Sequence, residues 1–262
     1  MKLNIIIPTI NPDKIYPLIE SFLTSYTGEW EAIIIGPYKI PSQCLSKWGP
    51  DHIKIIQDWG SPVRCQQRAL LACTGDYVTR MVDDGQYIGG TLDLAIQKVK
   101  PDTVVNMKFT ESNSSIDLSH KDCQQNAMAS DEFYHLQYHN QTLMPYVPAN
   151  FQVINFGIYP RGILLAVGGW DCQFESIAVA ELDLSIRLQF FGAKLALTEG
   201  LVLACGWTPG EEGDHGPMHH AFYADMEKYK KIYSDISYEN RITIPIDNWK
   251  QAPVVWERRF GK

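Results

Sequence analysis

Residues 75–85 read Gly-Asp-Tyr-Val-Thr-Arg-Met-Val-Asp-Asp-Gly, and the rest of the chain can be interpreted outward from them. Tyr77 to Val82 is a strand-like run that leads directly into Asp83, Asp84 and the turn residue Gly85. Ligands of open α/β sheets bind beyond the carboxyl ends of the strands. Two adjacent carboxylates at such an end are therefore well placed for chemistry, although Asp-Gly can also serve only as a turn.

The sequence before this stretch alternates between strand and helix periods. Residues 3–7, interrupted only by Asn4, and residues 32–35 are apolar runs, as expected for strands covered on both faces. Between them, apolar residues at positions 15–26 recur with the spacing of one helix face. A short strand over 52–57 and a helix over 61–73 complete the pattern. Alternating strands and helices predict a mostly parallel sheet with helices on both sides.

After residue 85 the same alternation continues more weakly. The sequence predicts a helix over 91–99, a strand over 103–109, a strand near 151–158, and a helix between Pro160 and Gly168. Residues 110–150 are polar without a clear period, so we expect an excursion that could shape a substrate pocket. No repeat or linker divides the chain. We therefore expect one domain over 1–224 and a C-terminal extension over 225–262 that packs back on it.

Residues 181–190 read Glu-Leu-Asp-Leu-Ser-Ile-Arg-Leu-Gln-Phe and are ambiguous. Strict alternation of polar and apolar residues favours a strand. The acids at the start of the segment and Gly192 after it favour a helix. Periodicity alone does not decide between the two.

Composition restricts the class of protein. The 262 residues are 45% hydrophobic and carry a formal net charge of −7, which argues against binding nucleic acid or an anionic membrane surface. No apolar run reaches the roughly 18–20 residues of a spanning helix, and no signal peptide is evident. The six cysteines include no Cys-x-x-Cys pair, so we expect reduced thiols and a cytoplasmic protein.

Three features suggest chemistry. Asp83 and Asp84 suit a hard divalent cation that also binds phosphate oxygens. A carboxylate in residues 168–188 could act as a general base, although these residues could also be an amphipathic segment with a solvated acidic face. His215 lies in the glycine-rich, proline-broken segment 207–220, where we expect an irregular loop and a possible third metal ligand. The nearby histidines could equally be surface residues.

Four motifs together resemble family 2 glycosyltransferases of the GT-A fold. They are Pro8-Thr9-x-Asn11, Gly75-Asp76-Tyr77 leading into Asp83-Asp84, Gly168-Gly169-Trp170-Asp171-x-x-Phe174-Glu175, and Glu181-x-Asp183-Leu184-Ser185-x-Arg187-Leu188. The resemblance covers roughly residues 3–220. It implies an α/β fold of GT-A type, a Rossmann-like α/β/α sandwich with a mostly parallel central sheet.

The resemblance also implies roles for individual residues. Asp84 and His215 would hold a Mn²⁺ or Mg²⁺ ion, and Asp83 would be a ligand or a ribose contact. Glu181 would be the catalytic base at the start of a helix, which favours a helix over 181–191. The residues that would contact the nucleotide sugar are Pro8, Thr9, Asn11, Arg64, Arg68, Asp83, Gly169 and Trp170.

Three positions depart from the family pattern. Gly36-Pro37 stands where the family usually has an acid that recognises the nucleotide base, so the base is not defined by this position. Ala180-Glu181 replaces a Glu-Asp pair and keeps only its second acid. Cys65-Gln66-Gln67 replaces Ala-Arg-Asn, so the flanking Arg64 and Arg68 are either nucleotide contacts or snorkelling surface residues.

The function implied is an inverting transfer of a sugar from a UDP- or GDP-sugar to a hydroxyl of a glycan or other acceptor. The metal would stabilise the diphosphate leaving group and a carboxylate would deprotonate the acceptor. Two alternatives remain. A sugar nucleotidyltransferase would carry a glycine- and basic-rich loop after the first strand, where this chain has Pro8-Thr9-Ile10-Asn11-Pro12. The second alternative is a catalytically inactive nucleotide-sugar-binding or scaffold protein on the same fold.

Overall fold

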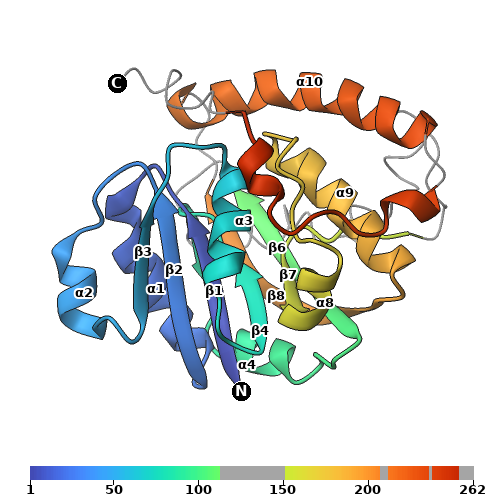
Figure 1. Cartoon of the computed structure of the whole chain (residues 1–262). Helices are drawn as coiled ribbons and strands as arrows, with labels where there is room; N and C mark the ends of the chain where they lie inside the picture. The colour runs from blue at the N-terminus through green and yellow to red at the C-terminus, as the bar shows by residue number, and fades with distance from the viewer. Residues whose placement is uncertain (113–150, 207–211, 236–237, 254–262) are drawn as a thin grey trace.

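The computed structural model describes residues 1–112, 151–206, 212–235 and 238–253, so the excursion expected over 110–150 lies almost entirely outside the described residues. The strands of the described part form one sheet in the order β3-β2-β1-β4-β7-β6-β8-β5 (Figure 1). They are β1 (Lys2–Pro8), β2 (Glu29–Gly36), β3 (Ile53–Gln57), β4 (Tyr77–Arg80), β5 (Gly85–Tyr87), β6 (Thr103–Ser112), β7 (Gly157–Pro160) and β8 (Lys194–Gly206).

Helices connect these strands. The α-helices are α1 (Ile15–Ser25), α2 (Ser42–Trp48), α3 (Pro62–Ala72), α4 (Thr91–Ile96), α8 (Arg161–Ala166), α9 (Ile177–Phe190) and α10 (Glu212–Asp235). Short 3₁₀ turns are η1 (Pro12–Lys14), η2 (Tyr238–Arg241) and η3 (Asn248–Gln251).

The half of the sheet formed by β1 to β4 is parallel. β1 pairs in parallel with β2 and β4, and β2 pairs in parallel with β3, so the carboxyl ends of these strands meet at one edge. In the other half, β6 and β8 are parallel, whereas β7 runs antiparallel to β4 and β6, and β5 antiparallel to β8. The sheet is therefore mixed but mostly parallel, as the alternating periods predict.

Two hydrophobic cores lie on opposite faces of the sheet because successive strand residues point to opposite sides. Ile6 of β1 belongs to the core under α3, α9 and α10. Its neighbours Ile5 and Ile7 belong to the core under α1 and α4. Figure 1 shows the resulting layers, with helices on both sides of the strands. This arrangement explains why residues 5–7 are apolar without alternation.

The ambiguous segment is a helix. α9 runs from Ile177 to Phe190, which confirms the helix favoured by the family resemblance. Its polar residues Glu181, Asp183 and Arg187 are buried together with its apolar ones. The polar and apolar alternation therefore reflects buried ion pairs within the core and not the two faces of a strand.

The strand predicted near 151–158 is wrong in its first half. β7 begins only at Gly157, because side chains of α9 take the backbone hydrogen bonds of the preceding segment. The Gln189 amide accepts from Gln152 N at 3.0 Å, and Ser185 Oγ accepts from Ile154 N at 2.8 Å.

The loop predicted over 207–220 is also wrong for the residues after 211. α10 begins at Glu212 and continues through Gly216-Pro217. A proline removes one backbone hydrogen bond, but tertiary packing supplies most of the stability of a helix in a protein. Here Met226, Tyr229 and Tyr233 are buried in the core. The boundary expected at residue 224 lies inside this helix.

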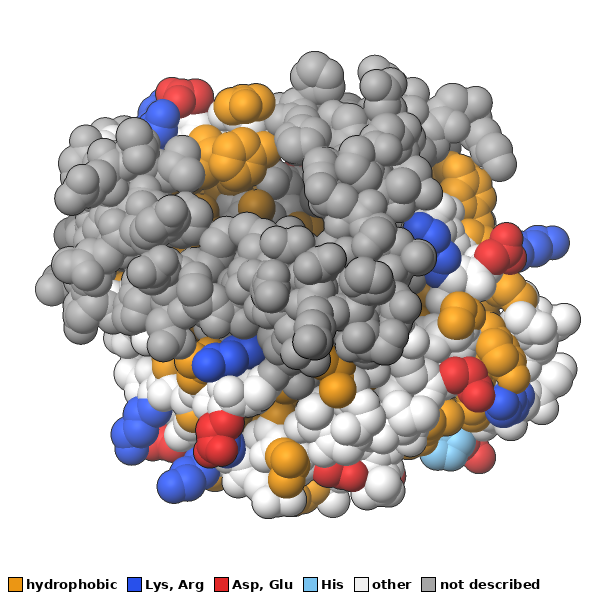
Figure 2. Space-filling model, turned by 180° about the vertical axis from the view of Figure 1, so that it is seen from behind, with side chains coloured by type: hydrophobic (Ala, Val, Ile, Leu, Met, Phe, Trp, Pro, Cys, Tyr) orange, Lys and Arg blue, Asp and Glu red, His pale blue; other side chains and the backbone are white. Residues whose placement is uncertain are grey.

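Within the described ranges, no helix combines the length and apolar character of a membrane span. On the face shown in Figure 2, the described Lys and Arg side chains lie among Asp and Glu side chains.

Candidate active site

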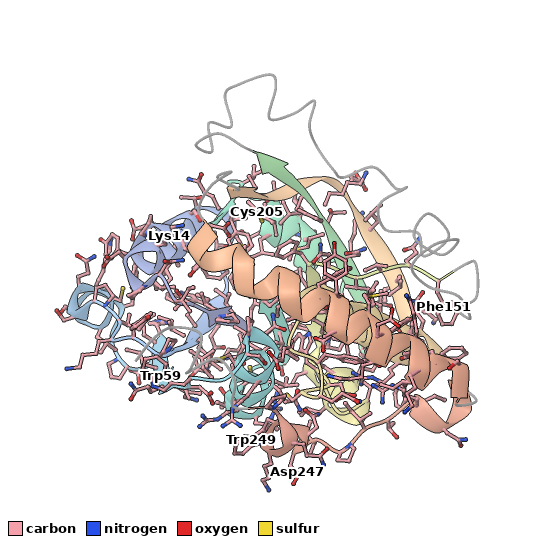
Figure 3. The ribbon with its side chains drawn as sticks, turned by 90° about the horizontal axis from the view of Figure 1, so that it is seen from above. Lys14, Trp59, Phe151, Cys205, Asp247 and Trp249 are labelled. Carbon is pink, nitrogen blue, oxygen red and sulfur yellow. The ribbon has the colours of Figure 1, made fainter. Side chains whose placement is uncertain are left out.

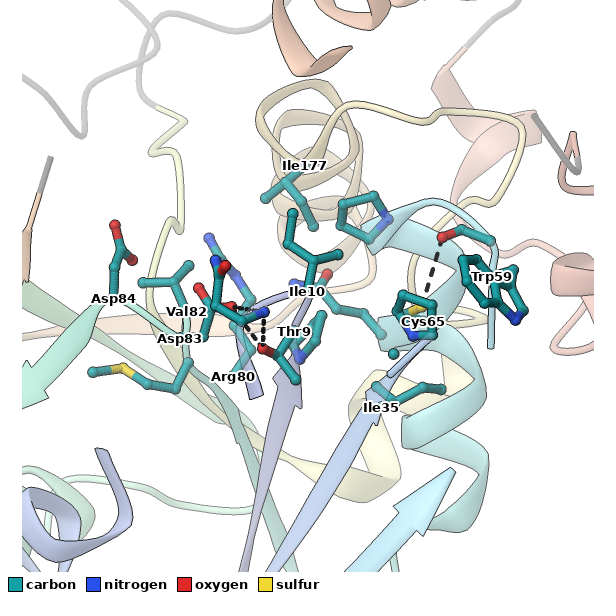
Figure 4. A pocket seen from close by; sticks show the side chains of 18 residues that line it. Thr9, Ile10, Ile35, Trp59, Cys65, Arg80, Val82, Asp83, Asp84 and Ile177 are labelled. Atoms are coloured by element: carbon teal, nitrogen blue, oxygen red, sulfur yellow. Dashed lines mark hydrogen bonds between the residues drawn. The ribbon is translucent and has the colours of Figure 1, made fainter. Parts of the chain in front are cut away.

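A cavity of about 180 Å³ opens at the carboxyl ends of the parallel strands. Figure 4 shows Trp59 at one end of it, Asp83 and Asp84 at the other, and Thr9 and Ile10 between them. Its described lining comprises Pro8, Thr9, Ile10, Asn11, Ile35, Gly36, Pro37, Trp59, Gly60, Pro62, Cys65, Gln66, Arg80, Met81, Val82, Asp83, Asp84 and Ile177. The fold therefore places the acid pair and the segment after the first strand in one cavity.

The end of β1 orients Asp83. Thr9 Oγ1 donates to Asp83 Oδ2 at 2.6 Å, and Asn11 N donates to the same oxygen at 3.2 Å. Asn11 N also donates to Thr9 Oγ1 at 2.9 Å. Asp84 lines the same end of the cavity and points away from Thr9 in Figure 4. The two carboxylates thus differ in environment, since Thr9 and Asn11 fix one oxygen of Asp83.

Two carboxylates from the protein are enough to bind Mg²⁺ when a phosphate ligand supplies further oxygen atoms. Mg²⁺ commonly keeps several waters and takes one or two carboxylates together with substrate phosphates. Among the side chains that the structure describes, no three of His, Cys, Asp or Glu gather as metal ligands. His215 belongs to α10, but its side chain lies outside the described part of the chain. The acid pair therefore fits a cation shared with a phosphate ligand.

The other end of the cavity is apolar and aromatic. Trp59 lies in the segment between β3 and α3, and its ring meets that of Tyr38 edge to face with centroids 5.8 Å apart. Ile35, Pro37 and Cys65 complete this end. An aromatic ring beside apolar side chains offers a stacking surface for a planar group.

The close approach of two strands explains why no acid follows β2. A Cβ atom at Gly36 would lie 1.9 Å from the backbone oxygen of Thr9. The backbone of Asp58 also donates to Gly36 O at 3.0 Å, which holds the end of β3 against the same residue. No side chain fits at position 36 unless the strand ends separate, so a carboxylate at this position is excluded sterically.

Replacing Gly36 by alanine is expected to destabilise the protein by about 1–3 kcal/mol, the usual cost of forcing atoms into a packed site. The added methyl group pushes the ends of β1 and β2 apart. Urea denaturation measures the resulting loss in the free energy of unfolding. Gly162→Ala is the matched control, because a Cβ there meets nothing within 4 Å and Gly162 lies within α8. Equal stability of the two variants would contradict this account of Gly36.

Arg64 and Arg68 lie outside the cavity lining and bind a buried acid that the sequence analysis did not single out. Arg64 Nε lies 3.1 Å from Asp58 Oδ1, and Arg68 pairs with Asp58 Oδ2. The two guanidinium carbons also lie 5.0 and 5.2 Å from the ring centroid of Trp249. Figure 3 places Trp249 beside α3. Both arginines thus hold the C-terminal segment against α3.

The structure brings an additional residue, Arg80, into the cavity. Arg80 ends β4, is 2% exposed and lines the cavity three residues before Asp83. A charged residue inside a buried strand is rarely tolerated without a partner. That position in the predicted strand was therefore the sequence signal for a functional or paired arginine.

Glu181 is the partner of Arg80. Glu181 Oε1 lies 2.7 Å from Arg80 Nε and accepts from Trp170 Nε1 at 3.0 Å. Glu181 is 1% exposed and is not among the residues that line the cavity. Burial raises the pKa of Glu181, although Arg80 and Trp170 act in the opposite direction. In this structure the guanidinium of Arg80 reaches the cavity and the carboxylate lies behind it.

Gly169 and Trp170 also lie behind the cavity. Trp170 is fully buried, and its backbone nitrogen donates to Gln67 Oε1 at 2.9 Å. Gly169 has a φ of +68°, and a Cβ there would lie 2.2 Å from the same oxygen. These residues join α3 to α9 and position Glu181 through the indole nitrogen.

Comparison with known proteins shows similarity at the level of structure. No family model matches the sequence, and no curated protein matches it either. Among solved structures, TarS of S. aureus aligns over 92% of this chain with a TM-score of 0.59 and 16% identity. This chain covers 41% of that TarS chain, so it spans less than half of its length.

Two structures of a shorter TarS fragment are also similar. TarS 1-349 in complex with UDP aligns over 92% of this chain and 68% of its own, with 15% identity and a TM-score of 0.59. TarS 1-349 in complex with UDP-GlcNAc aligns over 95% and 72%, with 16% identity and a TM-score of 0.62. Similarity at this level of identity concerns the fold, and the chain has the GT-A-type α/β fold that its sequence motifs imply.

Proposed function

We propose that this chain is a metal-dependent glycosyltransferase that moves a sugar from a nucleotide-diphosphate donor to a hydroxyl acceptor with inversion at the anomeric carbon. The observation that carries the proposal is the pair Asp83 and Asp84 at the end of β4, in one cavity with the aromatic side chain of Trp59. The nucleobase would lie at the Trp59 end and the diphosphate at the acid pair. UDP and UDP-GlcNAc are bound in TarS structures of similar fold, so UDP-sugars are the first donors to test.

Asp84 is the principal metal ligand in this proposal, with Asp83 as a second ligand or a ribose contact. Thr9 and Asn11 bind Asp83 Oδ2, and Asp84 lines the same end of the cavity. His215 remains the proposed distal ligand. A bound Mn²⁺ or Mg²⁺ would supply Lewis-acid stabilisation of the negative charge on the leaving diphosphate.

Electrostatics at the cavity support the need for a cation. Asp83 and Asp84 line it, and Arg80 is already paired with Glu181 behind it. A diphosphate would bring further negative charge to this site. A divalent cation would offset this repulsion.

Glu181 is the proposed general base. In the transfer step its carboxylate takes the proton of the acceptor hydroxyl, the acceptor oxygen bonds to the anomeric carbon, and the bond to the diphosphate breaks with its electron pair going to the leaving oxygen. For this role the acceptor hydroxyl must reach the carboxylate beside Arg80. The raised pKa of Glu181 suits a base, because proton transfer is most efficient when the pKa lies near the working pH.

The burial of Glu181 also supports a second candidate function. With its carboxylate paired to Arg80 and 1% exposed, the chain could bind a nucleotide sugar without transferring it. Metal-dependent hydrolysis of UDP-GlcNAc by the wild-type chain separates the two functions. Turnover supports the transferase, whereas binding without turnover of any UDP- or GDP-sugar supports the inactive binding protein.

Asp84→Asn tests the metal assignment. We expect UDP with Mn²⁺ to raise the melting temperature of the wild-type chain by several degrees, since ligand at 100 times its Kd adds about 2.7 kcal/mol of stability. The manganese-dependent part of this rise should disappear in Asp84→Asn, because an amide is a weaker ligand for a hard cation. A thermal-shift titration with and without Mn²⁺ measures it.

The exposed Asp51 provides the matched control, since Asp51→Asn removes the same charge far from the lining residues. It should retain the full manganese-dependent rise. An unchanged rise in Asp84→Asn would refute the metal assignment, and no rise with any nucleoside diphosphate in the wild type would refute the proposed function.

A further inference from the structure

Arg80 is the arginine that lines the cavity in the part of the chain that the structure describes. Its guanidinium is held at a fixed place on three sides. Nε lies 2.7 Å from Glu181 Oε1, and Nη2 donates to the backbone and side-chain oxygens of Asn155 at 2.7 and 2.8 Å. Its Cζ lies 4.5 Å from the ring centroid of Phe156. These contacts immobilise the side chain before any ligand binds.

The contacts leave one nitrogen of the guanidinium for a ligand. Nε and Nη2 have the partners just named, and the described residues supply no hydrogen-bond acceptor to Nη1. Arginine is suited to phosphate recognition because its donors lie in a rigid plane and remain protonated. An arginine fixed by a carboxylate and an asparagine needs little further ordering when an anion arrives.

We propose that Arg80 binds the diphosphate of the donor through Nη1 and that Glu181 and Asn155 hold the guanidinium in position for it. The proposal rests on the proposed function and adds to it a phosphate-binding residue of the chain itself. Arg80 lies at the same end of the cavity as the acid pair, because only Met81 and Val82 separate it from Asp83 along the chain. The diphosphate would then be bound between this guanidinium and a cation on Asp84.

The alternative cations are engaged elsewhere. Arg64 and Arg68 were the arginines that the family resemblance implied for nucleotide binding. Both pair with Asp58 and pack on the Trp249 ring, and neither lines the cavity. Arg80 therefore has a position that Arg64 and Arg68 lack, together with an ion pair to Glu181 at 2% exposure.

Binding of UDP and of uridine to the full chain, by calorimetry with and without Mg²⁺, tests the proposal. In Arg80→Met the affinity for UDP should fall about 10- to 100-fold, as expected for loss of a hydrogen bond to a charged group. The affinity for uridine, which has no phosphate, should stay within about twofold of the wild type. The UDP affinity of Arg80→Lys should lie between those of the wild type and Arg80→Met, since lysine keeps the charge but not the planar group.

Loss of Arg80 alone leaves the buried Glu181 unpaired and could unfold the chain, so Arg80→Met is also made together with Glu181→Gln. This double variant removes both charges and should show the same loss for UDP and none for uridine. Arg68→Met serves as the comparison, because it removes an arginine outside the cavity and should leave UDP affinity within about twofold.

Three outcomes would overturn the proposal. Equal UDP affinity of wild type and double variant, or a parallel loss for UDP and uridine, contradicts a phosphate contact at Arg80. A larger loss in Arg68→Met than at Arg80 assigns the contact to Arg68. If the wild-type chain binds no nucleoside diphosphate with or without Mg²⁺, the proposed function fails, and this inference fails with it.

Discussion

Replacing Glu181 by glutamine is expected to lower the rate of sugar transfer by about 10²–10⁴-fold, the usual contribution of a general base. Glutamine has nearly the same shape, and its amide oxygen can still accept from Trp170 Nε1 and face Arg80 Nε, the contacts that Glu181 Oε1 makes now. The substitution removes the proton acceptor while preserving the environment of Arg80. The measurement is the single-turnover rate with UDP-GlcNAc and an acceptor, next to the Kd for UDP.

If Glu181 is the general base, the substitution must lower the rate of transfer without a matching change in the Kd for UDP. UDP affinity should remain within a few-fold of the wild type while transfer is lost. Equal loss of binding and transfer would instead identify Glu181 as a structural counter-ion of Arg80. Glu175→Gln, at a half-buried position outside the lining of the cavity, is the control and should keep both activities.

Replacing Arg241 by methionine is expected to destabilise the protein by about 3–5 kcal/mol, the usual cost of removing one partner from a buried ion pair. Arg241 Nε donates to Asp183 Oδ1 at 2.9 Å, and its Nη2 pairs with Asp171. Asp183 also accepts from Tyr233 Oη at 2.8 Å and from Arg187 Nε at 2.8 Å. This network ties η2 and α10 to α9.

The control for Arg241 lies in the same C-terminal segment. Lys250 pairs with Asp247 at 3.0 Å, but both side chains are more than half exposed. Exposed pairs contribute about 0–1 kcal/mol, so Lys250→Met should change the free energy of unfolding by no more than that. Urea denaturation of both variants at pH 7 makes the comparison, and similar stability of the two would contradict the proposed role of the buried network.

The pH dependence of the Arg241 effect has a definite sign. Burial alone would raise the pKa of Asp183, but Arg187 and Arg241 outweigh it and hold the pKa below its usual value. A lowered folded-state pKa contributes stability that is fully present above the unfolded value of about 3.9 and is lost as the pH falls through the folded value. The difference between wild type and Arg241→Met should therefore be largest near neutral pH and narrow below about pH 4.

The order of strands and helices and the location of the acid pair follow from the sequence. The apolar runs at 5–7 and 32–35 specify strands buried on both faces, and the i, i+3, i+4 spacing over 15–26 specifies the helix between them. Asp83 and Asp84 come directly after the strand-like run Tyr77 to Val82, so their place at the end of a strand required no knowledge of the fold. These features are local, and local periodicity records which face of an element is buried.

The partners of the charged side chains were decided by the tertiary structure. Arg80 and Glu181 are 101 positions apart in the chain, and Arg241 reaches Asp183 across 58 positions. Arg64 and Arg68 pair with Asp58, and Trp249 of the C-terminal segment packs on both guanidinium groups. A charge buried at a low dielectric must find a counter-charge, but the sequence does not say which one, because the partner is set by how distant elements pack. The sequence by itself thus determined which elements form and which strand end carries the acids, whereas packing between distant segments decided that Arg80 faces the cavity and Glu181 lies behind it.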